Sequence, residues 1–362
     1  MTKLCVFLAI GESFADFAKK GQDSLLIKQN LAHYTSSFDS VVVFSYGNEE
    51  FSPIKNVKIL PNRWKIHRFL YSLLLPILYR KQIQSCDVIR CLQLTGGIPG
   101  VIAHILFKKK YIINYGYRYD KNAANEGKWL HMWLYKLIEP IIFFHAWSII
   151  VTTDSLKQSL IKKTKKPIYI IPNGVDIELF SFRANKVKSS YILYVGRIEK
   201  SKNLEALVYA VGICKKKYTL FFVGWGQEKN HLLEIAKSYD TKLVILDAVP
   251  HHDLPKYYRE ASLFVLPSLG EGNPKVLLEA MSSGIPVVGT NVRGIRELVH
   301  HRQNGILCGT EPQEIASAID WVLDHPSEAK KMSIKARTMI EKSFTLSTTM
   351  AKEVALLKKG IE

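Results

Sequence analysis

Short apolar runs alternate with longer amphipathic stretches along almost the whole sequence. Such runs are typical of strands buried on both faces of a parallel sheet. Eleven runs fit this description: residues 4–10, 40–46, 87–94, 111–116, 148–153, 168–172, 191–195, 218–223, 243–246, 262–266 and 286–289. Stretches with helical periodicity lie between them, for example 24–34, 204–214 and 275–282. The alternation predicts an α/β fold with helices on both faces of parallel sheets.

The expected strands are too many for one small sheet, and the length of 362 residues is enough for two α/β domains. The segment IPNGVDIELFSFRANKVKSS combines Pro, Asn-Gly, Asp and a polar run, which are turn and linker signals. A new strand begins directly after it. We therefore expect a first domain over residues 1–177, a second over 178–345, and a last helical segment over 346–362.

The chain is strongly basic, with a formal net charge of +18. Up to Ile177 it has 24 basic and 12 acidic residues, a difference of +12, and the remainder contributes 26 minus 20, or +6. Such an excess attracts polyanions: nucleic acid, anionic lipid or phosphorylated substrates. The five cysteines are irregularly spaced, so they indicate neither a disulfide framework nor a zinc site.

The longest apolar stretches, residues 69–79 and 141–151, are shorter than the roughly 18 residues that suggest a membrane span. The N-terminal run fits a buried strand better than a signal peptide, so we expect a cytoplasmic protein without a transmembrane anchor. Residues 63–81 mix basic and aromatic side chains around an apolar middle. They fit either a helix packed on the first sheet or an interfacial helix on an anionic membrane.

The first candidate site follows the strand at residues 191–195. Gly196 ends this run, and Arg197 and Lys202 follow before the next helix. A glycine at the carboxyl end of a strand lets a ligand approach the backbone. Arginine offers a planar fork to phosphate oxygens and lysine a point charge, so the two can neutralise a pyrophosphate leaving group. A solvated turn with incidental basic residues is the alternative.

The second candidate site lies between residues 270 and 290. Glu271 stands in a Gly-Glu-Gly loop directly after an apolar strand, and Glu279 lies two turns into the following helix among apolar neighbours. A carboxylate there is costly unless it is paired or hydrogen-bonded, and sugar hydroxyls are suitable donors. The helix N-terminus favours phosphate. The alternative for Glu279 is a position on the helix surface.

Together the motifs carry a family resemblance. IPNGVD, VGRIEKSKN, FVGWGQ, LFVLPSLGEGNPKVLLEAMSSGIPVVGTNVRGIRELV and NGIL follow one another along the second half of the chain. This pattern resembles the retaining glycosyltransferases of family 4, which have the GT-B fold. The resemblance implies two Rossmann-like doubly wound domains facing an interdomain cleft, with the C-terminal helix, within 346–362, packed back on the first. It also implies a nucleotide-sugar donor, retention of anomeric configuration, and no metal or other cofactor.

The resemblance also implies roles for individual side chains. Arg197 and Lys202 would hold the donor diphosphate, and Glu271 would accept hydroxyls of the donor sugar, so that these three residues form the catalytic set. Glu279 would hold the ribose. We expect full activity in excess EDTA, because the two cations replace a metal.

Backbone groups complete the implied donor site. Gly272 and Asn273 would offer backbone donors to the sugar, and Leu278 would offer an N–H group to phosphate. Gly21 matches the glycine-rich loop of the family in the first half of the chain, where backbone approaches the phosphate.

Two departures from the family pattern change these expectations. The loop after Gly272 reads Asn273, Pro274 and Lys275 where the family often has Gly-Leu-Pro. Pro274 has no N–H group, so one backbone donor is missing, and Lys275 could add a cation instead. Residues 115–118 occupy the place of a histidine found in many members, so no catalytic histidine is assigned.

The expected function is transfer of a hexose from a UDP- or GDP-sugar to a glycan or lipid-linked acceptor in surface-polysaccharide or glycolipid assembly. Because the first half is so basic, we expect peripheral binding to the inner face of the cell membrane, released at high salt. A nucleotide-sugar epimerase or a phosphorylase of the same fold is the alternative among enzymes. A nucleic-acid-binding protein is the alternative of another class, but no RNP, KH or zinc signature supports it, and no nucleic-acid partner is expected.

Overall fold

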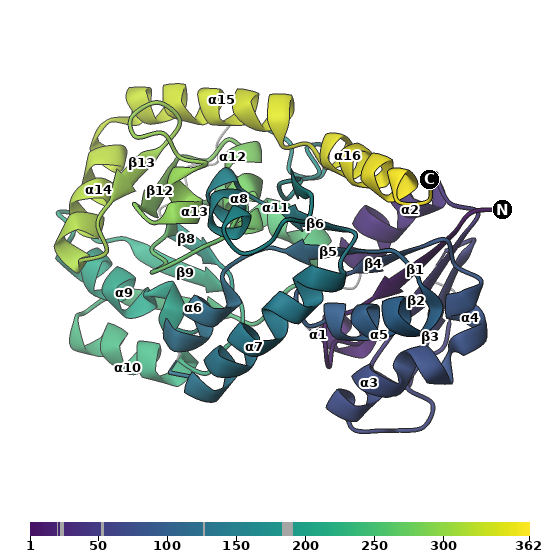
Figure 1. The fold of residues 1–362 in the computed structure, drawn as a ribbon. Coiled ribbons are helices and arrows are strands. Elements are labelled where there is room, and N and C mark those ends of the chain that lie inside the picture. Colours follow the sequence, from purple (N-terminus) through teal and green to yellow (C-terminus); the bar gives the residue numbers. More distant parts are fainter. Residues whose placement is uncertain (20, 22–24, 52–53, 126, 183–190) are drawn as a thin grey trace. The chain divides into compact units, whose positions relative to one another are not determined.

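In the computed structural model the chain forms two compact units (Figure 1). The structure describes residues 1–362 except 20, 22–24, 52–53, 126 and 183–190. The first unit contains Met1–Pro172 and Thr349–Glu362, and the second contains Asn173–Thr348. The chain therefore leaves the first unit five residues before the expected boundary at 177, and its last residues belong to the first unit.

A parallel sheet forms the centre of the first unit. Its described strands are arranged in the order β3-β2-β1-β4-β5-β6-β7, and every neighbouring pair is parallel. The strands are β1 Lys3–Phe7, β2 Ser40–Phe44, β3 Val57–Leu60, β4 Val88–Cys91, β5 Tyr111–Tyr115, β6 Ser148–Val151 and β7 Ile168–Ile170. The order reverses between β1 and β4, as in doubly wound folds.

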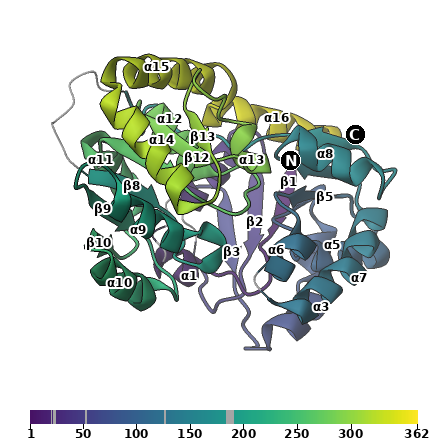
Figure 2. The ribbon, with the colours of Figure 1, turned by 90° about the vertical axis from the view of Figure 1, so that its left-hand side faces the viewer.

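Helices cover this sheet. They are α1 Phe14–Lys19, the π-helix η1 Leu25–Leu31, α2 Ala32–Thr35, α3 Arg68–Leu78, α4 Arg80–Gln84, α5 Gly97–Phe107, α6 Tyr119–Asn125, α7 Trp129–His145, α8 Asp154–Ile161 and α16 Leu346–Lys359. Helices α3, α5 and α7 pack side by side in one layer, with α6 against α7 (Figures 1 and 2). No described helix is both long and apolar enough to cross a bilayer.

The second unit repeats the same architecture with fewer strands. The sheet order is β10-β9-β8-β11-β12-β13, again with all described neighbours parallel. The strands are β8 Tyr191–Val195, β9 Thr219–Val223, β10 Lys242–Leu246, β11 Leu263–Leu266, β12 Val287–Thr290 and β13 Ile306–Cys308. The helices are the 3₁₀-helices η2 Lys200–Lys202 and η3 His251–Asp253, and α9 Leu204–Ile213, α10 Lys229–Ser238, α11 Leu254–Glu260, α12 Lys275–Ser282, α13 Arg293–Arg296, α14 Pro312–Asp324 and α15 Pro326–Ser343.

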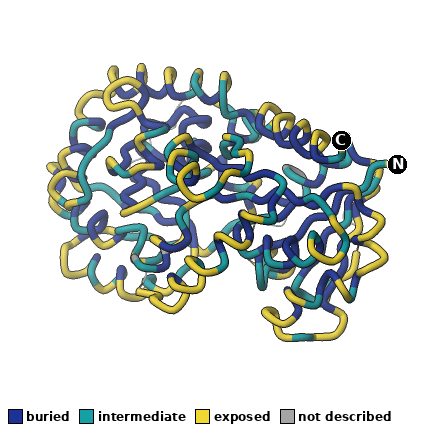
Figure 3. The backbone as a smooth tube through the Cα atoms, in the orientation of Figure 1, coloured by how far each residue is buried: buried dark blue, intermediate teal, exposed yellow. Residues whose placement is uncertain are grey.

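Each unit has its own hydrophobic core, built from the strands and the inward faces of the helices. Buried backbone follows the strands, while the outer turns of the helices are exposed (Figure 3). Four of the five cysteines are buried, and all five are free thiols. The fold therefore rests on two packed α/β cores and on no disulfide bond.

The sequence predicted eleven of these strands, and the structure confirms each of them. Several are shorter than the apolar run that predicted them; the run at 87–94, for example, gives β4, Val88–Cys91. The two strands that it missed, β3 and β13, both lie at a sheet edge. An edge strand is buried less completely, and β3 carries the exposed Lys58 while β13 has only three residues. Their apolar signal is correspondingly weak.

A buried ion pair attaches the C-terminal helix to the sheet of the first unit. Arg90 on β4 donates to both carboxylate oxygens of Glu353 on α16, at 2.7 and 3.2 Å. The hydroxyl of Tyr34 on α2 also donates to Glu353. All three residues are buried. A helix more than 260 residues away in sequence is thereby fixed to the middle of this sheet.

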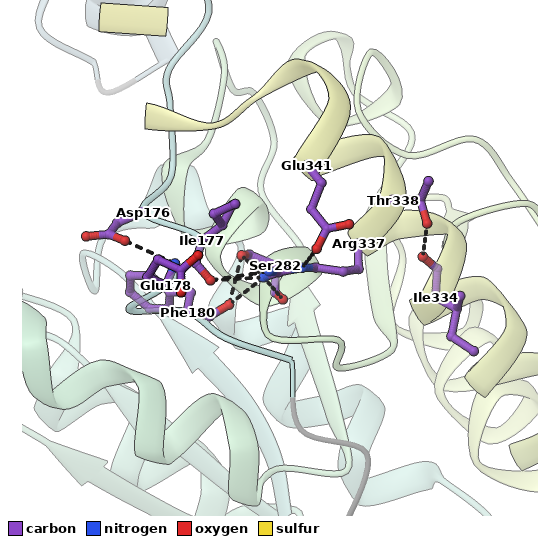
Figure 4. A network of polar contacts seen from close by, with 9 residues as sticks. All are labelled: Asp176, Ile177, Glu178, Phe180, Ser282, Ile334, Arg337, Thr338 and Glu341. Atoms are coloured by element: carbon purple, nitrogen blue, oxygen red, sulfur yellow. Dashed lines mark hydrogen bonds and ion pairs between the residues drawn. The ribbon is translucent and has the colours of Figure 1, made fainter. Parts of the chain in front are cut away.

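A second arginine organises the beginning of the second unit. Arg337 on α15 donates to the carbonyl oxygens of Phe180 and Ser282, at 2.9 and 2.8 Å, and at 3.3 Å to that of Ile177 (Figure 4). The carbonyl of Ser282 is at the C-terminal end of α12, where backbone acceptors lack helical partners. Arg337 thus joins the entering chain to the end of the helix that carries Glu279.

The Arg90–Glu353 pair gives a stability prediction. Glu353→Ala leaves the buried Arg90 guanidinium without a counter-charge, which we expect to cost about 3–5 kcal/mol of unfolding free energy. The double variant Arg90→Met/Glu353→Met should recover most of the loss, because it buries no unpaired charge. Asp324→Ala, which breaks an exposed ion pair with Lys216, is the control and should change little. Urea unfolding measures the free energy of unfolding of these three variants. If Glu353→Ala were as stable as Asp324→Ala, the pair would not hold α16.

Candidate functional site

The candidate site lies where the strand order of the second sheet reverses. Strand β8 pairs with β9 on one side and with β11 on the other, so the connections after β8 and β11 begin at adjacent strand ends. In open parallel α/β sheets, ligands bind outside the carboxyl ends of the strands at this reversal. The two sequence motifs at Gly196–Lys202 and Gly270–Glu279 follow β8 and β11, so the topology brings them together.

An ion pair joins the two motifs. The Nζ atom of Lys202 lies 2.7 Å from Oε1 of Glu271, and the hydroxyl of Ser268 donates to the same oxygen at 2.7 Å. The side chains of Lys202 and Glu271 are only 14% and 12% exposed. The other carboxylate oxygen, Oε2, has no partner within the described part of the chain. The pair is therefore nearly buried, yet one oxygen of Glu271 remains available as an acceptor.

Backbone contacts fix the relative position of the two connections. The N–H group of Leu269 donates to the carbonyl of Ser201 at 3.0 Å, next to Lys202. Thr290, at the end of β12, donates its hydroxyl to the carbonyl of Ser268 at 2.6 Å. The Cα of Gly294 faces the carbonyl of Gly272 so closely that a Cβ atom would come within 2.2 Å of it. Only glycine at 294 lets these backbones approach.

Gly196 meets the expectation for a glycine at a strand end. Its φ of 149° and the hydroxyl of Tyr194, which would lie 2.7 Å from an added Cβ, both disfavour any other residue. That hydroxyl donates to the carbonyl of Arg197 at 2.7 Å and so holds the turn. Burial raises the pKa of Tyr194 well above its usual value, and the negative charge of Glu271 adds to the effect. Tyr194 is therefore a neutral donor in this turn.

Arg197 is more open than Lys202. Its side chain is half exposed, and its guanidinium pairs with Glu199 at 2.9 Å. It belongs to the same connection after β8, but it does not contact Glu271. The structure thus places a mostly buried cation and a half-exposed one in the same turn.

Glu279 is buried, so its alternative interpretation as a helix-surface residue is wrong. It is 5% exposed on α12 and accepts a hydrogen bond from the hydroxyl of Tyr258 at 3.0 Å. Its other oxygen lies 2.9 Å from Nε2 of His251. The ring of Phe180 packs against both partners. The carboxylate therefore has its polar partners inside the protein.

The residues before α12 are also held by named contacts. Asn173 donates its backbone N–H to Oδ1 of the buried Asn273 at 2.8 Å, and its side-chain amide to the Asn273 carbonyl at 2.5 Å. Pro274 precedes the first residue of α12, Lys275. The N–H group of Leu278 donates to the Pro274 carbonyl at 3.4 Å, within the helix. The backbone donor expected at Leu278 is thus already engaged, by a long hydrogen bond.

Gly21 belongs to the first unit. It lies in the turn between α1 and η1 with φ of 65°, and its N–H donates to the carbonyl of Ala18 at 2.9 Å. The adjoining residues 20 and 22–24 lie outside the described residues. The helix expected over 24–34 is instead the π-helix η1 followed by α2. A π-helical turn is uncommon and often marks a functional segment.

Four further residues complete the surroundings of the predicted site: Asn173, His251, Tyr258 and Ser268. Asn173 lies in the IPNGVD motif, and Ser268 two residues before Gly270, so proximity in sequence could have identified both. His251 and Tyr258 have no motif context and reach Glu279 only through the folding of η3 and α11. Among the described residues, no group of His, Cys, Asp or Glu has the arrangement of a metal site.

Comparison with protein families matches both halves of the chain. The family model described as Glycosyl transferases group 1 matches residues 176–339. The model described as Glycosyltransferase Family 4 matches residues 30–179. The division between the matches lies close to the change from the first unit to the second.

Curated relatives are glycosyltransferases. An uncharacterized glycosyltransferase of Haemophilus influenzae is 34% identical over 43% of this chain and 46% of its own length. The capsular polysaccharide biosynthesis glycosyltransferase CapM of Staphylococcus aureus is 25% identical over 90% of this chain and 89% of its own. An Escherichia coli UDP-Gal:alpha-D-GlcNAc-diphosphoundecaprenol alpha-1,3-galactosyltransferase is 28% identical over 62% of each. The chain spans about half the length of the first curated relatives it matches.

Solved structures share the fold. A sucrose-phosphate synthase from Thermosynechococcus elongatus superposes with a TM-score of 0.86 at 19% identity, over 99% of each chain. Anabaena HepE, in complex with UDP and glucose, superposes with a TM-score of 0.78 at 18% identity, over 99% of this chain and 100% of its own. Together with the two sheets, these similarities identify the fold as GT-B.

The surroundings of Glu279 give a prediction. Tyr258→Phe removes a donor to a buried carboxylate, and we expect a loss of about 1.5–3 kcal/mol in unfolding free energy. Tyr257→Phe, at the neighbouring and less buried position, is the matched control and should stay within about 0.5 kcal/mol of the wild type. Equal stabilities of the two variants in urea unfolding would show that Glu279 does not depend on Tyr258.

Proposed function

The chain belongs to glycosyltransferase family 4, and from this premise we propose that it transfers a hexose from a nucleotide-sugar to an acceptor. We propose a UDP- or GDP-linked donor, retention of anomeric configuration and no metal ion. The observation that carries the proposal is the Lys202–Glu271 pair at the reversal of the second sheet. It supplies a cation and a carboxylate acceptor at adjacent strand ends, which is the combination that a sugar attached to a diphosphate requires.

Lys202 and Arg197 would neutralise the donor diphosphate. The leaving group gains negative charge as the bond between the sugar and the phosphate breaks, so fixed cations beside it lower the barrier. Lys202 is mostly buried and held by Glu271, which keeps its ammonium in one place. Arg197 is half exposed and paired with Glu199, so its planar fork can turn toward phosphate oxygens when a donor binds. Because the protein supplies two cations, the proposed reaction needs no metal.

Glu271 would bind the donor sugar. Its Oε1 atom is occupied by Lys202 and Ser268, while Oε2 has no partner in the described part of the molecule. A sugar hydroxyl can donate to Oε2 without displacing Lys202. Backbone groups of Gly272 and Asn273 would complete this contact, and Asn173 holds Asn273 in position.

Glu279 would bind the ribose of the donor nucleotide. His251 and Tyr258 already contact one carboxylate oxygen each, and each oxygen keeps a second lone-pair direction for a ribose hydroxyl. The two partners thereby fix the carboxylate before a donor arrives. Lys275 would contribute at the start of α12, where helix geometry favours phosphate, whereas the N–H of Leu278 is held by the Pro274 carbonyl.

The proposed acceptor is a glycan or a lipid-linked saccharide in surface-polysaccharide or glycolipid assembly. The names of CapM and of the E. coli galactosyltransferase support this class: the first refers to capsular polysaccharide, and the second to an acceptor on diphosphoundecaprenol. The first half of the chain, with a net charge of +12 up to Ile177, would be attracted to an anionic membrane surface. We therefore propose a peripheral enzyme at the inner face of the cell membrane.

Substitution of Glu271 tests the proposed site. Glu271→Ala should lower transfer or hydrolysis of a UDP- or GDP-sugar to less than about a tenth of the wild-type rate, a barrier increase of at least ~1.4 kcal/mol. From the sequence alone, the position of Glu271 in a loop predicts that this variant loses little stability. The ion pair changes that expectation, because the variant leaves the nearly buried Lys202 without its partner.

A second variant therefore separates folding from function. Glu271→Gln keeps the shape and can still accept a hydrogen bond, so it should fold normally yet lose most of the activity along with the charge. Asp324→Ala breaks an ion pair elsewhere in the same unit and should keep full activity. A panel of UDP- and GDP-sugars, monitored by release of the nucleoside diphosphate, measures all three. Wild-type rates in both Glu271 variants would show that the site is assigned wrongly.

A further inference from the structure

Helix α7 exposes a stripe of large apolar side chains that none of the described residues covers. Its outer face consists of Leu130, Trp133, Leu134, Leu137, Ile141 and Phe144. Leu130 is 71% exposed, Leu137 67% and Phe144 72%. They recur at intervals of three or four residues, with Trp133 and Leu134 adjacent, which places them along one side of the helix. Single exposed apolar residues are ordinary on protein surfaces, but a contiguous stripe marks an interaction surface.

The opposite face of α7 is held in place, so this stripe cannot turn inward. Met132, Ile142 and Phe143 are buried in the first unit. Glu139 is also buried and pairs with Lys163 at 2.5 Å, while the hydroxyl of Tyr115 donates to it at 2.7 Å. Rotation of the helix would expose this carboxylate cluster and the inner apolar residues. Both sides of α7 are therefore apolar, and only the inner side has a partner in the described structure.

Neighbouring helices extend the apolar surface. Helix α5 packs against α7, and α3 packs against α5 (Figures 1 and 2). Helix α5 exposes Ile105 and Leu106, and α3 exposes Phe69, Leu73 and Ile77. The inner residues of α3, such as Tyr71 and Leu75, are buried. The structure confirms that α3, within residues 63–81, packs on the fold with one side. Its other side is apolar and exposed, and the interfacial interpretation stays a prediction.

The exposed charged side chains of the segments around this surface are all positive. The segments 63–81, 97–110 and 128–145 contain eight exposed basic residues, and their single acidic residue is the buried Glu139. The exposed basic residues are Arg63, Lys65, Arg68, Lys81, Arg80, Lys108, Lys128 and Lys136. Arg63 pairs with Glu50 from outside these segments. An apolar stripe bordered by cations complements acyl chains below a layer of anionic headgroups.

We infer that the outer face of α7 inserts into the interface of an anionic lipid bilayer. The helix has 17 residues, fewer than the roughly 20 that span a bilayer, so it would lie in the membrane plane. The Nζ atom of Lys136 lies 4.8 Å from the centre of the Trp133 ring, which places a cation beside an aromatic ring as at membrane interfaces. The inference rests on the proposed function, in which the acceptor is linked to lipid.

If α7 inserts, the binding of the protein to vesicles should depend on salt differently than if charge alone holds it there. The net charge of the first half predicts binding that is released at high salt. Insertion of the apolar stripe adds a component that salt does not screen. Raising the salt from about 0.1 M to 1 M shortens the Debye length from about 10 to 3 Å. We therefore expect the protein to bind vesicles more weakly at 1 M salt, but to remain measurably bound.

The test uses the full chain and vesicles of phosphatidylcholine with and without phosphatidylglycerol, with neither donor nor acceptor present. The wild type should sediment with the anionic vesicles and should retain part of this binding at about 1 M salt. Leu130→Ser/Leu137→Ser/Phe144→Ser should bind at least about tenfold more weakly and lose the salt-resistant part. The control Ile213→Ser/Ile334→Ser removes exposed apolar residues from the second unit and should bind like the wild type. Circular dichroism should show that both variants are folded.

Tryptophan fluorescence reports insertion directly. The chain has six tryptophans, and Trp129 and Trp133 are both exposed on α7. The fluorescence should shift to shorter wavelength on anionic vesicles and be quenched by brominated acyl chains, and both effects should be smaller in Trp133→Phe. Equal binding of the triple variant and the wild type would overturn the inference. The inference would also be overturned if the wild type were a dimer and the triple variant a monomer that binds vesicles equally well. The stripe would then be an interface between two copies of the chain. Because the assay involves no catalysis, loss of the proposed enzymatic function would leave its result intact.

Discussion

The Lys202–Glu271 pair is the contact on which the arrangement of the second unit's candidate site depends. It joins the connections that follow β8 and β11, two adjacent strands at which the sheet order reverses. Each side chain is too deeply buried to be stable without the other, so each fixes the position of its partner. Ser268, and the hydrogen bond from Leu269 to Ser201, reinforce the same alignment. A cation and a carboxylate are thereby held at adjacent strand ends before any ligand arrives.

Much of this arrangement could be predicted from the sequence, because its signals are local. Apolar runs predict eleven of the strands, α12 has the bounds expected for it, and α16 begins at the expected residue 346. The strands β3 and β13 were missed, because β3 carries the exposed Lys58 and β13 has only three residues. The partners of Glu279 were missed for another reason: His251 is 28 residues away, and only the folded chain brings it to the carboxylate. A motif identifies a functional residue but not the side chains that hold it.

The exposed face of α7 shows a further limit of sequence patterns. Residues 128–145 are apolar on nearly all sides, so periodicity cannot tell which side packs on the sheet. The sequence indicates residues 63–81 as a candidate membrane segment, because basic and aromatic residues there flank an apolar middle. In the structure, the larger exposed stripe is on α7, and its orientation is set by the buried Glu139 and its contacts with Lys163 and Tyr115. The buried Glu139, together with the buried Met132, Ile142 and Phe143, therefore decides which apolar side of α7 remains outside.

Calorimetric titration with UDP, GDP and ADP tests the central claim most directly, because it asks whether Lys202 and its neighbours bind a nucleoside diphosphate without a metal. With EDTA present, at least one of these nucleotides should bind the wild type, and added magnesium should not strengthen the binding. Lys202→Met should weaken it at least about tenfold, or ~1.4 kcal/mol. Lys216→Met, which removes an exposed cation from the same unit, should leave it unchanged. Binding that required magnesium, or that was unaffected by Lys202→Met, would contradict the account.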